Sequence, residues 1–151
     1  MTTEHSAYRP FQVLMVEDNG GDVFLMQKAL REKVLSIRVD VVTDGEDGLA
    51  YLRREGRFED ALRPDLVLLD LNLPLMDGRT LLRKVKRDPA LRAIPILVFT
   101  SSSLDSDIRE AYDLDANSYV MKPTDLAGFR RVAEDLSDFW FKRALLPPQE
   151  S

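Results

Sequence analysis

The sequence contains no cysteine and a single histidine among its 151 residues. Without cysteine the chain can form neither a disulfide framework nor a thiolate metal site, and it has no thiol nucleophile. The one histidine, His5, lies in a polar N-terminal stretch, where we expect it to be exposed to solvent and without a function. These absences exclude a disulfide scaffold, an iron–sulfur protein and a cysteine enzyme.

Long hydrophobic runs and an excess of positive charge are also absent. No apolar run approaches the ~18 residues that a membrane span requires, and residues 1–10 lack the hydrophobic stretch of a secretory signal. Twenty-six acidic against 21 basic residues give a net charge of −5, which disfavours non-specific binding to nucleic acid or to anionic membranes. We therefore expect a cytoplasmic protein with neither a nucleic-acid nor a membrane partner.

What the sequence does contain is an alternation of short apolar segments and helical patterns. The apolar segments, each bounded by polar or turn residues, are residues 11–16, 37–42, 65–71, 94–99 and 117–121. Strands that are apolar on both sides need helices on both faces of their sheet. We therefore predict an α/β fold with a doubly wound, five-stranded parallel sheet and five helices. This single domain would span residues 11–142, between tails at residues 1–10 and 143–151.

Polar side chains stand at the carboxyl ends of four of these five segments. In open parallel sheets the functional site lies beyond that edge of the sheet. The first segment is followed by Glu17 and Asp18, the third reaches Asp70, the fourth leads into Thr100, and the fifth into Lys122. The sequence therefore predicts that these five side chains form one site.

The charges of this site predict its chemistry. Three carboxylates cannot all stay ionised side by side without compensation, and Lys122 supplies one positive charge, which leaves a deficit that one divalent cation matches. Mg²⁺ is the natural choice, because it prefers oxygen ligands and phosphate. We predict that Glu17 and Asp18 bind the metal, that Lys122 and Thr100 bind phosphate oxygens, and that the central Asp70 attacks phosphorus.

Together these residues resemble the receiver domain of two-component response regulators. The resemblance covers about residues 11–140 and rests on five elements in order, which are Glu17–Asp18, Asp70, the following Asn72, Pro74, Asp77 and Gly78, Thr100 thirty positions after Asp70, and Lys122–Pro123. It implies a flavodoxin-like, CheY-like sheet with strand order 2-1-3-4-5.

The resemblance also implies roles for individual residues. A sensor histidine kinase would donate a phosphoryl group to Asp70, with Mg²⁺ bound by Glu17 or a water held by Glu17, and by Asp18, Asp70 and the backbone carbonyl of Asn72. The peptide bond before Pro123 is expected to be cis. The protein would catalyse only its own phosphorylation and dephosphorylation.

Two further residues are implied to act as a switch. Thr100 would move towards the phosphoryl oxygen and Tyr119 would rotate inward behind it, which alters the surface formed by the fourth helix, the fifth strand and the fifth helix.

The residue after Thr100 departs from the family pattern. The family commonly has Ala or Gly there, whereas this chain has Ser101, whose larger side chain would narrow access to the phosphate and so affect the rates of phosphoryl transfer and hydrolysis. With no output domain after the closing helix, a stand-alone receiver would act by binding another molecule, or by serving as a phosphate sink or relay. The segments EDNGGD and FWFKRALLPP are similar to receivers that accompany phytochrome-type kinases.

The end of the closing helix predicts a homodimer. Phe129, Val132, Leu136 and Phe139 form a stripe that we interpret as core. Phe139, Trp140 and Phe141 are consecutive and span about 200° of a helix, so at least one should face solvent. With Leu145 and Leu146 nearby, we predict a homodimer that contacts through Trp140, Phe141 and the C-terminal tail. The alternative is a tail that folds back over its own aromatic residues.

Other interpretations of the same residues stay open at this stage. A phosphohydrolase of the haloacid-dehalogenase type would need an acid two positions after its nucleophile, where this chain has Asn72. A flavodoxin-like cofactor module would need a first loop without acids. Glu17 and Asp18, or Thr100, could instead cap helices, and Lys122 could simply form a salt bridge with Asp70.

Overall fold

The computed structural model describes residues 9–142, 145, 147 and 148 of the chain. Five parallel strands form one sheet in the order β2-β1-β3-β4-β5, as predicted. Their bounds are β1 (Phe11–Val16), β2 (Ile37–Val42), β3 (Leu66–Leu69), β4 (Ile96–Thr100) and β5 (Ser118–Met121). The third strand is shorter than the apolar run of residues 65–71, so that Asp70 stands just beyond its end.

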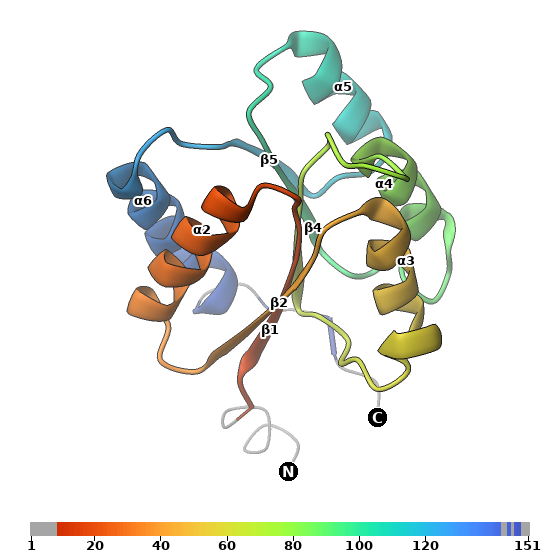
Figure 1. Cartoon of the computed structure of the whole chain (residues 1–151), viewed down its shortest axis with the longest axis horizontal. Helices are drawn as coiled ribbons and strands as arrows, with labels where there is room; N and C mark the ends of the chain where they lie inside the picture. The colour runs from red at the N-terminus through yellow and green to blue at the C-terminus, as the bar shows by residue number, and fades with distance from the viewer. Residues whose placement is uncertain (1–8, 143–144, 146, 149–151) are drawn as a thin grey trace.

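Helices cover both faces of this sheet, with two on one side and three on the other (Figure 1). The first group consists of α2 (Gly20–Lys33) and α6 (Leu126–Leu136), and the second of α3 (Gly45–Arg53), α4 (Gly78–Arg87) and α5 (Asp105–Asp113). A short 3₁₀ turn, Gly56–Phe58, follows α3. None of the helices in the described part of the chain has the length and apolar character needed to cross a bilayer.

The alternation of side chains along the central strands explains this arrangement. Leu14 and Val16 of β1 point into the core beneath α3, α4 and α5, whereas Val13 and Met15 point into the core beneath α2 and α6. All four side chains are almost completely buried. Because both faces of β1 are apolar, the strand is stable only between two layers of helices.

Short polar side chains fix where most helices begin at the carboxyl edge of the sheet. The side chains of Asn19, Asp44, Asp77 and Asp125 each accept a hydrogen bond from the backbone N–H three residues later, at 2.7–3.0 Å. Such caps satisfy N–H groups that have no partner within the helix. Helix α5 differs, because its N-cap, Leu104, has no side-chain acceptor.

The end of α6 departs from the predicted pattern. Residues Ser137–Phe141 form a π-helical segment, in which hydrogen bonds join residue i to residue i+5. In a continued α-helix Phe141 would lie about 140° around the axis from Leu136, but the π-helical turn brings it back to the same side. Phe141 is consequently 8% exposed, with its ring centroid 4.8 Å from that of Phe11.

Phe139 is correspondingly turned outward and is 56% exposed, so its interpretation as a core residue is wrong. The expectation that at least one of the three consecutive aromatic residues is exposed is confirmed by this residue. The predicted dimer contact through Phe141 needs correction, because the side chain is buried within its own chain. Trp140 is half-buried, and its ring packs edge-on against Phe139 at 5.5 Å.

Candidate functional site: an acidic cluster at the carboxyl edge

Three predicted carboxylates converge where β1 and β3 end. Glu17, Asp18 and Asp70 each offer a carboxylate oxygen, and these oxygens all lie within 4.8 Å of one another. Glu17 and Asp70 are buried, whereas Asp18 is exposed, so the cluster opens to solvent on one side. Such a group of hard oxygen donors can hold a divalent cation.

The register of the strands brings these acids together. Val16 of β1 pairs with Leu69 of β3, so the residue that follows each of them, Glu17 or Asp70, stands at the same level of the sheet. The backbone N–H of Asp70 donates to the carbonyl oxygen of Val16 at 3.1 Å. Gly78 closes the loop after Asp70, since a Cβ at this position would collide with the Asp70 carbonyl oxygen.

Lys122 extends from the end of β5 into this cluster. Its Nζ lies 2.7 Å from Glu17 Oε1 and 3.1 Å from Asp70 Oδ2, and also 2.9 Å from Asp22 Oδ2. The side chain of Lys122 is only 9% exposed. Although burial disfavours its charge, the hydrogen bonds from its ammonium to these three acids raise the pKa of Lys122 above its ordinary value. The ammonium is therefore a fixed positive charge within the site.

Asp22 is a contact that the strand-end analysis missed. It lies in the first turn of α2 rather than at the end of a strand, so a search of strand ends could not find it. The only signal in the sequence is its place in the acidic segment EDNGGD. The site consequently holds four carboxylates around one lysine.

Burial in this acidic cluster perturbs Glu17. Burial raises the pKa of Glu17 to about 7, and the Asp70 carboxylate adds to the rise. Hydrogen bonds from Lys122 and from the backbone N–H of Asn19 act in the opposite direction without cancelling it. The cluster therefore resists full ionisation at neutral pH, which is the property expected of a site that gains a cation.

Both oxygens of Asp70 have defined partners. Thr100 Oγ1 donates to Oδ1 at 2.9 Å, the backbone N–H of Asn72 donates to Oδ1 at 3.2 Å, and Lys122 Nζ donates to Oδ2. Thr100 is completely buried at the end of β4. Since the N-cap of α5 is Leu104, the alternative that Thr100 caps this helix is wrong. For α2, the side-chain cap is Asn19 and neither Glu17 nor Asp18.

Tyr119 lies on β5 but does not touch the acids through its hydroxyl. Its OH donates to the carbonyl oxygen of Ser102 at 2.9 Å, so it ties β5 to the segment between Thr100 and α5. Partial burial raises the pKa of Tyr119. The structure thus places Tyr119 beside the segment that follows the predicted switch residue, and the rotation itself stays a prediction.

The expectation of a cis peptide bond before Pro123 is wrong. Every peptide bond in residues 9–142 is trans, that between Lys122 and Pro123 included. The trans form of an X–Pro bond is favoured by ~0.5–1 kcal/mol, so the cis form requires compensating contacts. The backbone N–H of Lys122 donates to the Thr100 carbonyl oxygen at 2.8 Å, which holds this residue at the end of β5.

A doubly wound sheet with converging acids, a lysine and a threonine at its carboxyl edge defines a phosphoryl-accepting type of domain. The response regulator receiver domain matches residues 13–134, and the chain belongs to this family. It is therefore a signalling protein of two-component systems.

Two cyanobacterial proteins show how far the similarity extends. The response regulator Rcp1 of Synechocystis is 35% identical over 138 residues, which are 91% of this chain and 94% of Rcp1. The Mn²⁺-bound structure of Rcp1 has a TM-score of 0.86 at 34% identity, covering 92% of this chain and 100% of the other. The phosphorylated cyanobacterial phytochrome response regulator RcpA has a TM-score of 0.88 at 41% identity, covering 92% and 99%.

Proposed function

We propose that Asp70 accepts a phosphoryl group from a phosphohistidine of a sensor kinase. The observation that carries this assignment is the placement of Asp70, whose carboxylate stands among the other acids with Lys122 on one oxygen and Thr100 on the other. In the reaction a bond forms between an Asp70 oxygen and phosphorus while the bond between phosphorus and the imidazole nitrogen breaks. The products are an acyl phosphate on Asp70 and a neutral histidine.

The neighbours of Asp70 each support this transfer. Lys122 offers a fixed ammonium that balances the charge of the incoming phosphoryl oxygens, and the Thr100 hydroxyl offers a hydrogen bond to one of them. Both groups already contact Asp70, so little reorganisation precedes the reaction.

We assign a Mg²⁺ site to Glu17, Asp18 and Asp70, with the backbone carbonyl of Asn72 as a further ligand. The converging oxygens and the raised pKa of Glu17 support this assignment. Bound Mg²⁺ would supply positive charge against the phosphoryl oxygens. Asn72, which cannot act as the acid of a phosphohydrolase, limits the chemistry to the protein's own phosphorylation and dephosphorylation.

Intact-mass measurement after incubation with Mg²⁺ and acetyl phosphate tests the acceptor. We expect wild type to gain one phosphate and Asp70→Asn to gain none. Asp60→Asn is a matched control, because this acid is exposed near the 3₁₀ turn, away from the cluster. A gain of phosphate in Asp70→Asn equal to that in wild type would contradict the assignment.

We further infer that Thr100 and Tyr119 transmit the signal. If the Thr100 hydroxyl moves towards a phosphoryl group on Asp70, the segment that follows Thr100 would move with it. Tyr119 is hydrogen-bonded to this segment through the Ser102 carbonyl oxygen and would respond to that movement. The affected surface would be that of α5, β5 and α6, through which the protein binds its target. Tyr119→Phe lacks only the bond to Ser102, so it should leave phosphorylation intact and change the affinity for the target.

We propose that the donor is a phytochrome-type histidine kinase in the cytoplasm, because the chain is similar to the cyanobacterial phytochrome response regulator RcpA over nearly its whole length. A phosphotransfer assay with one purified phytochrome-type kinase and one unrelated kinase tests this. Preference for the unrelated kinase would overturn the assignment without affecting the role of Asp70.

We also propose a homodimer through the end of α6 and the tail at residues 143–151. The exposed Phe139, the adjoining Trp140 and the fully exposed Leu145 support a contact there, whereas Leu146 lies outside the described residues. Light scattering should show a dimer for wild type and a monomer for Phe139→Ser. Phe24→Ser, which changes an aromatic residue of similar exposure on α2, serves as the control. Equal masses for all three proteins would refute the contact.

A further inference from the structure

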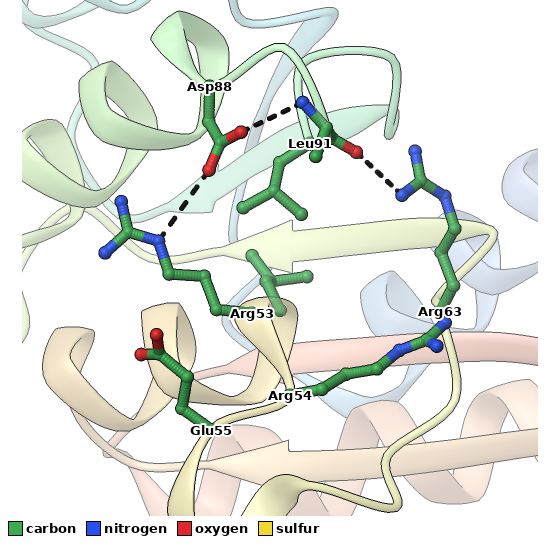
Figure 2. Close-up of a pocket in the computed structure, with 8 residues that line it drawn as sticks. Arg53, Arg54, Glu55, Arg63, Asp88 and Leu91 are labelled. Carbon is green, nitrogen blue, oxygen red and sulfur yellow. Dashed lines mark hydrogen bonds and ion pairs between the residues drawn. The ribbon is translucent and has the colours of Figure 1, made fainter.

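A basic groove lies at the opposite edge of the sheet from the acidic cluster. It consists of two adjoining cavities of about 360 and 540 Å³ that share Arg53 and Asp88, at the C-terminal ends of α3 and α4. Figure 2 shows the first of them. We define the basic groove by its charged residues, which are Arg53, Arg54, Glu55, Arg63, Arg83, Lys84, Arg87 and Asp88.

The charge of this groove contrasts with that of the chain. Six cationic and two anionic side chains give the groove a net charge of +4, whereas the whole chain carries −5. Basic residues in the last turn of a helix are favoured by the helix dipole, which accounts for Arg53 and Arg87. Arg54, the C-cap of α3, stands at the same end of the dipole, whereas Arg63 lies outside any helix, so the dipole does not explain its presence.

The contacts within the groove hold part of it in place and leave part available. Arg63 Nη1 donates to the carbonyl oxygen of Ala90 at 2.8 Å, and Asp88 Oδ1 accepts from the Ala90 N–H at 2.9 Å (Figure 2). Arg53 Nε is 3.7 Å from Asp88 Oδ2, a loose ion pair. Arg53 and Arg63 therefore keep N–H donors that no residue in the described part of the chain engages.

Arg54 differs from Arg53 and Arg63 in that its guanidinium makes no polar contact with the groove's other residues. It ends α3 in a left-handed backbone conformation, with φ of 56°, where glycine is favoured. Its guanidinium has no hydrogen bond or ion pair with any other residue that the structure describes. The left-handed conformation is a common way for a helix to end, so the observation that bears on a ligand is the guanidinium without a partner in the described part of the chain.

We propose that the basic groove binds the phosphate chain of a small ligand with two or more phosphate groups, either free or carried by a nucleoside. Arginine forks match phosphate oxygens in a bidentate manner. A terminal phosphate carries about −1.5 to −2 and each inner phosphate of a chain adds a further negative charge, so a chain of two or three phosphates offsets most of the groove's charge. The cavity volumes fall within the range of small-ligand sites.

Calorimetric titration of the metal-free protein with inorganic pyrophosphate, and separately with ADP, which has the same number of phosphates, tests the proposal. We expect Arg54→Gln and Arg63→Gln each to weaken binding about tenfold, the loss of one charge-assisted contact. Arg131→Gln removes the same charge from the exposed face of α6 and should bind as wild type does. Tighter binding of ADP than of pyrophosphate would identify a nucleotide as the ligand, and equal or weaker binding of ADP would identify a free phosphate chain. Binding of neither compound would overturn the proposal.

Arg54→Gly separates binding from folding. Glycine relieves the left-handed conformation, so this variant should have a higher melting temperature than wild type and yet bind pyrophosphate more weakly. Unchanged affinity in Arg54→Gly and Arg63→Gln would overturn the proposal. So would binding that requires Mg²⁺ and disappears in Asp70→Asn, which would place the ligand at the acidic cluster. Tighter binding of a polyglutamate peptide than of pyrophosphate would overturn it in favour of an acidic protein partner.

Discussion

Glu17→Gln should stabilise the metal-free protein at alkaline pH. The pKa of Glu17 is about 7 in the folded protein against an ordinary value of 4.5. Between these two values the unfolded chain loses its proton while the folded chain keeps it, so stability falls as pH rises through this window. Above pH 7 Glu17 is ionised in both the folded and the unfolded chain, and the free energy of unfolding falls no further on its account.

The size of this loss follows from the two values. At ~1.4 kcal/mol per pH unit, the difference between them corresponds to about 3 kcal/mol. Glutamine has no proton to lose, and its side-chain oxygen can still accept from Lys122 and from the Asn19 N–H. We therefore expect the free energy of unfolding of Glu17→Gln, relative to wild type, to rise by about 2–3 kcal/mol between pH 5 and pH 8.

Urea denaturation in the presence of EDTA at both pH values measures this difference. Glu59→Gln is the matched control, because this acid is exposed and should show no pH-dependent difference from wild type. A difference between Glu17→Gln and wild type that is the same at pH 5 and at pH 8 would refute the electrostatic reasoning. Saturating Mg²⁺ should stabilise wild type by ~2.7 kcal/mol at 100 times its Kd, and Glu17→Gln by much less.

Three further predictions concern packing and the site. Gly78→Ala should lower the free energy of unfolding by about 1–3 kcal/mol or more in urea denaturation, because its Cβ collides with the Asp70 backbone; wild-type stability would contradict this. Thr100→Val should slow phosphorylation by acetyl phosphate about tenfold, through the loss of a hydrogen bond worth ~1.5 kcal/mol, and an unchanged rate would exclude that role. Phe141→Ala should cost about 3–5 kcal/mol of stability and Phe139→Ala much less, and similar thermal unfolding of the two variants would show that the assigned burial is incorrect.

The sheet and the centre of the site could be predicted because they depend on short-range patterns. Apolar runs with polar ends predict parallel strands, and parallel strands align their carboxyl ends, so Glu17 and Asp70 had to meet. Lys122 follows from the same rule applied to the fifth strand. This reasoning needs no knowledge of side-chain conformation.

Other features depend on details that no such rule contains. Asp22 reaches Lys122 from a helix, so its contact depends on how α2 packs against the sheet. Phe139 is exposed and Phe141 is buried because the hydrogen bonding changes locally from α-helical to π-helical. The basic groove joins residues from separate helices and loops, which appear in the sequence only as scattered cations.

The π-helical segment Ser137–Phe141 also sets the direction in which a helix fused directly after residue 141 would leave the protein. In a chimera that continues α6 as an α-helix beyond Leu136, the aromatic side chains would point in other directions around the helix axis. Each residue by which the register shifts turns them by about 100°. The ring of Phe11 would then lose its partner Phe141, and the fused helix would point along a different azimuth. Designers of light- or ligand-controlled fusions should therefore place the junction after residue 141.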